Sequence, residues 1–210
     1  MSSLDKRVYF ADYVFFVDEN VYEPAEDSFL FAENLEVEPS EKVLDMGTGS
    51  GILAILAATS AESVVGVDIN PHAIRHAKKN ARTNNLQEKI SFVQGDLFGW
   101  LNPKTLFDVI LFNAPYLPVD NCGRSSWIER AWSGGSVGRQ IIDRFVSEVS
   151  NHLKPTGRVL LLQSTLANVC ETVGSFGKCN LGIRIIANCS LPFFETLVLM
   201  EARFETLCAN

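Results

Sequence analysis

A stretch in which every second residue is glycine constrains the fold of this chain more than any other feature. It reads Asp45-Met46-Gly47-Thr48-Gly49-Ser50-Gly51 and begins within the apolar run 42–46, which is typical of a buried strand. Glycine has no Cβ, so the backbone can turn sharply here and lie close to a ligand. Residues 52–59 then continue in a helical pattern. A strand, a glycine turn and a helix in this order predict an α/β fold that binds its ligand beyond the carboxyl ends of the strands.

Short apolar runs alternate with amphipathic stretches along the rest of the chain. Asn70 and Pro71 are a favourable N-cap and first helical residue, so a helix is expected to begin there. Another long helix is expected over 137–153, where apolar residues recur every three or four positions. Alternating strands and helices predict a parallel sheet with helices on both faces. The remaining predicted strands cover 63–68, 90–94, 107–112, 157–162, 183–187 and 196–200, with a turn at Leu191-Pro192 between the last two.

Length and composition favour one compact domain. The chain has 210 residues, of which 47% are hydrophobic, and this excludes intrinsic disorder. We expect a single domain over 1–210, with an N-terminal extension and first helix over 1–40 and a Rossmann-like core over 41–210. The 18 basic and 25 acidic residues give a net charge of −7, so a global basic field for binding nucleic acid or anionic lipid is absent.

Five cysteines are present, none of them in C-x-x-C spacing. An odd number without that spacing argues against a disulfide framework and against a zinc site. We therefore expect reduced thiols, no metal ligands and a cytoplasmic protein. The longest apolar stretches fall short of the ~20 residues that cross a bilayer, and acidic residues interrupt any N-terminal signal sequence.

The glycine stretch departs from two familiar phosphate-binding loops. A dinucleotide fingerprint would require glycine at position 52, where Ile52 stands, and no Gly-Lys-Ser/Thr follows Gly51 as a P-loop would require. The D-x-G-x-G-x-G spacing, with Asp45 at the strand end, resembles motif I of the class I S-adenosylmethionine-dependent methyltransferases. A purely structural glycine turn is the alternative.

Acidic residues also mark the ends of the next two predicted strands. Asp68 ends the first of them, where a carboxylate can accept hydrogen bonds from both hydroxyls of a ribose. The same resemblance implies that Asp96 faces the adenine amino group and that Leu97 packs on the adenine ring. The alternatives are that Asp68 caps the following helix and that Asp96 begins a turn. Three signals in order, each suited to one part of the same ligand, favour S-adenosylmethionine as the cofactor.

The fourth strand end carries Asn113-Ala114-Pro115-Tyr116. It resembles the (N/D/S)-P-P-(Y/F/W) motif of methyltransferases that modify planar amino or amide nitrogens. Such a nitrogen is a poor nucleophile because its lone pair is delocalised. The side-chain oxygen of Asn113 and the carbonyl of Ala114 could each accept one N–H, which orients the nitrogen and favours the charge that develops. Pro115 stiffens the turn and Tyr116 offers a flat wall, whereas Ala114 replaces the usual proline and relaxes the backbone. The alternative is that these four residues form a turn that has no catalytic role.

Two further segments indicate a smaller family within the class I methyltransferases. Residues 21–30 open a predicted amphipathic helix, and residues 131–139 lead into the long helix. Together with the two strand-end motifs, they look like the HemK-type protein-glutamine methyltransferases, in the short eukaryotic and archaeal branch, over about residues 20–160. The predicted first helix carries Ala25, Phe29, Ala32 and Leu35 on one stripe.

The resemblance implies a doubly wound, mostly parallel seven-stranded sheet with an antiparallel C-terminal strand, in three αβα layers. It implies methylation of the glutamine side-chain nitrogen in the Gly-Gly-Gln loop of a class-I translation release factor. It also implies a heterodimer with a small zinc-binding activator subunit, which would supply the zinc. Carried over by position, the cofactor contacts are Ser28, Asp45, Gly47, Gly49, Gly51, Asp68, Asp96, Leu97 and Asn113, and the substrate slot is Asn113, Ala114, Pro115 and Tyr116.

Other functions remain as hypotheses beside this one. The same chemistry could act on N6 of adenine in DNA or RNA, or on another protein, although the acidic balance speaks against nucleic acid. Ala114 would also suit a non-catalytic module that binds S-adenosylmethionine. A nicotinamide dehydrogenase is contradicted by Ile52. The long segment 117–135, with Trp127 and Trp132, suits a substrate lid and an aromatic plug of the core equally well.

Overall fold

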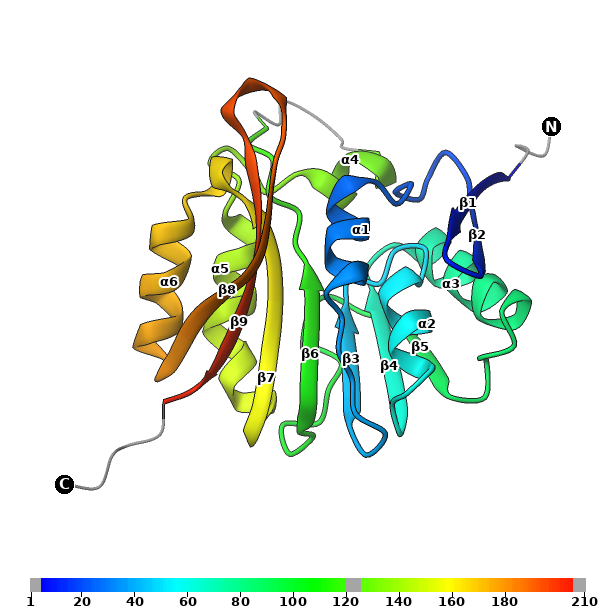
Figure 1. The fold of residues 1–210 in the computed structure, drawn as a ribbon, viewed down its shortest axis with the longest axis horizontal. Coiled ribbons are helices and arrows are strands. Elements are labelled where there is room, and N and C mark those ends of the chain that lie inside the picture. The colour runs from blue at the N-terminus through cyan, green and yellow to red at the C-terminus, as the bar shows by residue number, and fades with distance from the viewer. Residues whose placement is uncertain (1–4, 120–125, 206–210) are drawn as a thin grey trace.

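The computed structural model describes residues 5–119 and 126–205 and contains a seven-stranded sheet (Figure 1). The strand order is β5-β4-β3-β6-β7-β9-β8. Strand β9 runs antiparallel to both β7 and β8, and the other pairs are parallel, so the predicted fold class is confirmed. The strands are β3 (Lys42–Met46), β4 (Ser63–Asp68), β5 (Ile90–Gln94), β6 (Phe107–Asn113), β7 (Leu153–Ser164), β8 (Leu181–Ser190) and β9 (Thr196–Phe204).

Helices cover both faces of the sheet because successive strand residues point to opposite sides. In β6, Val109 and Leu111 face one core, whereas Ile110 and Phe112 face the other. The first core includes residues of α1 (Glu26–Glu33), α2 (Ile52–Ala58) and α3 (Pro71–Thr83). The second core includes residues of α5 (Gln140–Val149) and α6 (Val169–Lys178). Short elements are α4 (Trp127–Trp132), η1 (Ser150–His152), η2 (Thr165–Ala167) and η3 (Pro192–Phe194).

An N-terminal hairpin, absent from the predicted elements, packs against α3. It consists of β1 (Lys6–Phe10) and β2 (Tyr13–Val17). The buried side chain of Asn80 accepts from the backbone N–H of Phe16 at 2.8 Å and donates to its carbonyl at 3.0 Å. A helix side chain thus hydrogen-bonds both backbone groups of Phe16, and so holds the hairpin against α3.

Three predicted helical features differ from the structure. The long helix begins at Gln140 rather than at 137, because Gly138 has φ 72° and Val137 is 64% exposed. Leu153 starts β7 instead of ending that helix. The buried residues of α1 are Asp27, Ser28 and Phe31; the predicted stripe on that helix lies only partly in the core. Helix α6 was not predicted, since its glycines weaken the helical pattern.

No helix in the ranges 5–119 and 126–205 has the length and apolar character that crossing a bilayer requires.

Candidate active site

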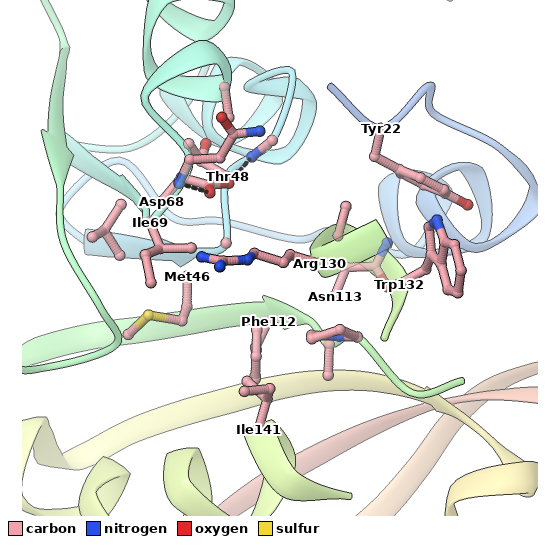
Figure 2. Close-up of a pocket in the computed structure, with 18 of the residues that line it drawn as sticks. Tyr22, Met46, Thr48, Asp68, Ile69, Phe112, Asn113, Arg130, Trp132 and Ile141 are labelled. Atoms are coloured by element: carbon pink, nitrogen blue, oxygen red, sulfur yellow. Dashed lines mark hydrogen bonds between the residues drawn. The ribbon is translucent and has the colours of Figure 1, made fainter. Parts of the chain in front are cut away.

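A cavity of about 570 Å³ lies beyond the carboxyl ends of β3, β4, β5 and β6. This volume suits a small organic ligand, and the location is the usual one for open α/β sheets. Figure 2 shows Asp68 and Thr48 on one side of the cavity and Asn113 with Trp132 on the other. Of the predicted site residues, Ser28, Asp45, Gly47, Gly49, Asp68, Asp96, Leu97, Asn113, Ala114, Pro115 and Tyr116 line the cavity, and Gly51 does not.

The glycine turn needs glycine for two different reasons. Gly47, Gly49 and Gly51 have φ of 67°, 54° and 85°, a region that residues with a Cβ rarely adopt. A Cβ on Gly51 would also lie 3.1 Å from the Cβ of Ala77, so this residue allows α2 to approach α3. The role of Gly51 is therefore close packing behind the cavity, while Gly47 and Gly49 face it.

Asp45 is fully buried and holds the glycine turn together. Its Oδ2 accepts hydrogen bonds from Thr48 Oγ1 at 2.6 Å and from the Ala54 N–H at 3.1 Å. Burial raises the pKa of the Asp45 carboxyl to about 7, against the lowering effect of these two bonds.

The raised pKa of Asp45 predicts a pH-dependent loss of stability. Between about pH 4 and pH 7 the folded chain keeps this proton and the unfolded chain releases it, so the free energy of unfolding falls as the pH rises. We expect Asp45→Asn to remove this contribution. Urea titrations of both chains at pH 5 and pH 8 would then give a smaller pH-dependent decrease for the variant. An equal decrease in both chains would contradict this assignment, with Asp12→Asn, an exposed position, as the control.

Asp68 lies at the junction of β4, the glycine turn and α3. Its two oxygens accept from the backbone N–H groups of Gly49 at 2.9 Å and Asn70 at 2.8 Å. Burial raises the pKa of this carboxyl, opposed by its backbone hydrogen bonds. The side chain is thus held firmly while it lines the cavity.

Asp96 and Leu97 lie on the same side of the cavity but in different environments. Leu97 is buried, with φ 45°, and belongs to the core beside α5. Asp96 is exposed and pairs with Arg144 of α5 at 2.8 Å. The cavity-facing carboxylate at the end of β5 therefore already has a cationic neighbour, and the sequence did not indicate this pair.

Asn113, the last residue of β6, carries an unused hydrogen-bond acceptor. Its Nδ2 donates to Asp27 Oδ2 at 3.1 Å, and Ser28 Oγ lies 3.5 Å away. A carboxylate oxygen only accepts, so the amide nitrogen must be the atom that faces Asp27. The other amide atom, Oδ1, is buried and has no hydrogen-bond partner among the described residues. A buried acceptor without a partner is rare and points to a donor that a ligand supplies.

Asp27 is the residue of this site that sequence reasoning missed. Besides Asn113, it accepts hydrogen bonds from the Tyr22 hydroxyl at 3.2 Å and from the Ser28 hydroxyl at 3.2 Å. The pKa values of the Tyr22 and Tyr116 hydroxyls are raised, first by burial and then by the nearby Asp27 charge. Both hydroxyls thus stay protonated, and one carboxylate in the first turn of α1 accepts hydrogen bonds from the side chains of Tyr22, Ser28 and Asn113.

Helix α4 forms an outer wall of the cavity within the predicted segment 117–135. Trp127, Arg130 and Trp132 line the cavity, and the Arg130 guanidinium carbon lies 4.9 Å from the centre of the Trp127 ring. Figure 2 shows the Arg130 side chain extending into the cavity. Residues 120–125 of this segment are outside the described residues. The two tryptophans are half-buried against the cavity, which supports a role as a cover more than as a plug of the core.

The side chains of the described residues do not form a metal-ligand cluster. No group of three or more histidine, cysteine, aspartate or glutamate side chains is arranged there to hold a metal ion. Cys170, Cys179 and Cys189 are free thiols, and Cys122 and Cys208 are outside the described residues.

Comparisons with known proteins agree with the geometry. The family model of the ribosomal protein L11 methyltransferase (PrmA) matches residues 28–117. A putative protein N5-glutamine methyltransferase from Methanocaldococcus jannaschii is 44% identical over 181 residues, which cover 85% of this chain and 90% of that protein. The human methyltransferase HEMK2 is 36% identical over 159 residues, which cover 68% of this chain and 71% of that protein.

A solved structure shares the fold over almost the whole of its own chain. The E. cuniculi Mtq2-Trm112 complex, described as responsible for methylation of the eRF1 translation termination factor, aligns with a TM-score of 0.67 at 26% identity. The alignment covers 89% of this chain and 99% of that chain.

Proposed function

The chain belongs to the protein N5-glutamine methyltransferases, and from this premise we propose that it methylates a glutamine side chain in a class-I release factor, at a Gly-Gly-Gln motif. One observation carries the proposal: the buried Oδ1 of Asn113 has no partner among the described residues and belongs to a residue that lines the cavity. Relatives named release factor glutamine methyltransferase, including one from Rhodopirellula baltica that is 33% identical, support this choice of substrate.

The residues at the cavity fit S-adenosylmethionine, which supplies an electrophilic methyl group when bound. Asp68 would accept hydrogen bonds from ribose hydroxyls, and Asp96 with Leu97 would hold the adenine. Gly47 and Gly49 would admit the cofactor close to the backbone, since no Cβ stands in the way. The cavity volume of about 570 Å³ supports this assignment.

Asn113 and Ala114 would hold the glutamine amide for attack. The Asn113 Oδ1 and the Ala114 carbonyl would each accept one N–H of the substrate, which keeps the nitrogen in place and stabilises its developing positive charge. The proton of the methylated amide is acidic enough to leave without a strong base. Pro115 and Tyr116 would form the walls of a slot for the planar amide.

Asp27 would act as a positioning residue for Asn113. Its carboxylate accepts the hydrogen bond that the Asn113 Nδ2 donates, and this orients the amide so that Oδ1 points away from α1. We expect Asp27→Ala to lower kcat about tenfold, because Asn113 is then free to rotate, with little change in the Kd of S-adenosylmethionine. Steady-state methyl transfer combined with calorimetry checks this. Glu33→Ala, an exposed change on the same helix, is the control, and an unaltered kcat in Asp27→Ala would refute the role.

A small activator subunit is part of the proposed assembly. The complex of Mtq2 with Trm112 supports a heterodimer for this chain. We propose that any zinc belongs to that subunit, since the described residues of this chain offer no cluster for it.

Mass spectrometry tests the proposed function. The chain, co-expressed with a candidate activator, is incubated with release factor and S-adenosylmethionine, and peptides are then sequenced. We expect one added methyl group on the glutamine of Gly-Gly-Gln. A methyl group on nucleic acid, or on a different protein alone, would replace this assignment with one of the other methyltransferase functions.

A further inference from the structure

Two phenylalanines at the tip of the β8–β9 hairpin are the most exposed large apolar residues described. Phe193 is 96% exposed and Phe194 is fully exposed, and both follow Pro192 in the short η3 element. Figure 1 shows this hairpin projecting beyond the sheet on the side where α4 lies. Large aromatic rings are rarely left entirely in water unless a partner covers them.

The hairpin tip has an unusual backbone conformation and is closed by hydrogen bonds at its base. Phe193 and Phe194 both have φ of 62°, a left-handed conformation that brings the Cβ close to the following carbonyl oxygen. The tip is closed by a hydrogen bond from the Leu191 N–H to the Glu195 carbonyl at 2.8 Å. Its base is fixed by the Thr196 N–H, which donates to Thr165 Oγ1 at 3.0 Å. Unfavourable backbone conformations that the surroundings enforce are concentrated at functional sites.

The base of the tip adjoins the proposed glutamine slot. Strand β9 is antiparallel to both β7 and β8, so β8 runs in the same direction as β7 and β6, and the tip that follows β8 lies at the same edge of the sheet as Asn113. Helix α1, which carries Asp27, also contacts both β8 and β9. Burial first, then the charges of Asp27, Glu195 and Glu26, raise the pKa of the Tyr116 hydroxyl, which agrees with acidic side chains on this side of the slot.

We propose that Phe193 and Phe194 dock the substrate protein beside the glutamine to be methylated. The surface they fit is an apolar patch next to one or more basic side chains, which would complement Glu26 and Glu195. This inference rests on the proposed function, because a slot for a glutamine within a folded protein must be bordered by the rest of that protein. Exposed aromatic residues of this kind supply much of the affinity in many interfaces.

The test is a Phe193→Ser/Phe194→Ser double variant in the complex with the activator. We expect KM for the folded release factor to rise roughly tenfold, the size typical of interface aromatics, with kcat and the Kd of S-adenosylmethionine unchanged. Ile185→Ser, which alters a 55% exposed position in the middle of β8, is the control and should leave KM unchanged.

Other outcomes would overturn the docking site. If the wild type methylates the release factor and the double variant has an unchanged KM, the proposed docking site is wrong and the proposed function stands. Loss of activator co-purification would assign the rings to that subunit, and a shift from dimer to monomer in sedimentation would assign them to a second copy of this chain. If the wild type transfers no methyl group to the release factor, the proposed function fails and the docking site with it.

Discussion

Asn113→Ala is expected to lower kcat for glutamine methylation by about 10²–10³-fold, the loss seen when one acceptor or donor that stabilises a developing charge is removed. The variant lacks the Oδ1 that would accept a substrate N–H, and alanine offers no replacement. The Kd of S-adenosylmethionine should stay within a few fold, because the proposed ribose contact is Asp68 at the end of β4 and the proposed adenine contacts are Asp96 and Leu97 after β5. Single-turnover transfer and calorimetry, performed on the same preparation, separate the two effects.

A matched variant distinguishes this loss from misfolding. Asn151→Ala removes an exposed asparagine from η1, outside the cavity, and should keep wild-type activity. Comparable kcat values for Asn113→Ala and the wild type would remove Asn113 from the chemistry.

Asp68→Ala is expected to weaken S-adenosylmethionine binding by about 1–3 kcal/mol, or roughly 5–150-fold in Kd. Part of this loss comes from hydrogen bonds to the ribose. The rest follows from the structure: Asp68 also accepts from the N–H groups of Gly49 and Asn70, so its removal loosens the glycine turn that faces the cofactor. Calorimetric titration with S-adenosylmethionine gives the Kd directly.

Stability measurements separate the binding loss from a general loss of structure. Asp12→Ala removes an exposed carboxylate in the β1–β2 turn and should leave the Kd unchanged. The midpoint of urea unfolding for Asp68→Ala shows how much of the effect is structural. An unchanged Kd in Asp68→Ala would place the ribose elsewhere.

The strand-end residues could be predicted because the chain itself determines their position. In a parallel sheet, residues that end neighbouring strands meet at one edge, so Asp45, Asp68 and Asn113 could be brought together from the order of the strands alone. Their side-chain chemistry then indicated one ligand. The structure adds that Asp45 points into the turn, toward Thr48 and Ala54, while lining the same cavity.

Asp27 could not be predicted in the same way. Its hydrogen bond with Asn113 joins residues 86 positions apart and depends on where α1 packs across the sheet. The predicted stripe on that helix placed Phe29 and Ala32 in the core, and gave no reason to turn Asp27 toward the end of β6. The one available signal was its place in the sequence: Asp27 directly precedes Ser28, and the resemblance had already assigned Ser28 to the site.

The hairpin tip and helix α4 were also beyond sequence reasoning. The exposure of Phe193 and Phe194 reverses the ordinary expectation for phenylalanine, and the left-handed backbone there is not encoded by glycine. Similarly, the tryptophans of 117–135 could be identified as important, but which surface they cover depended on the short helix α4.

A crystal structure of the chain and its activator with S-adenosylhomocysteine and a Gly-Gly-Gln peptide tests the central claim most directly. We predict that the cofactor sulfur lies beside Asn113 and that the glutamine nitrogen donates to the Asn113 Oδ1 and the Ala114 carbonyl. The space between sulfur and nitrogen should then admit a methyl group about 3–3.5 Å from the nitrogen. Electron density for the cofactor outside this cavity, or a glutamine side chain bound away from Asn113, would contradict the account.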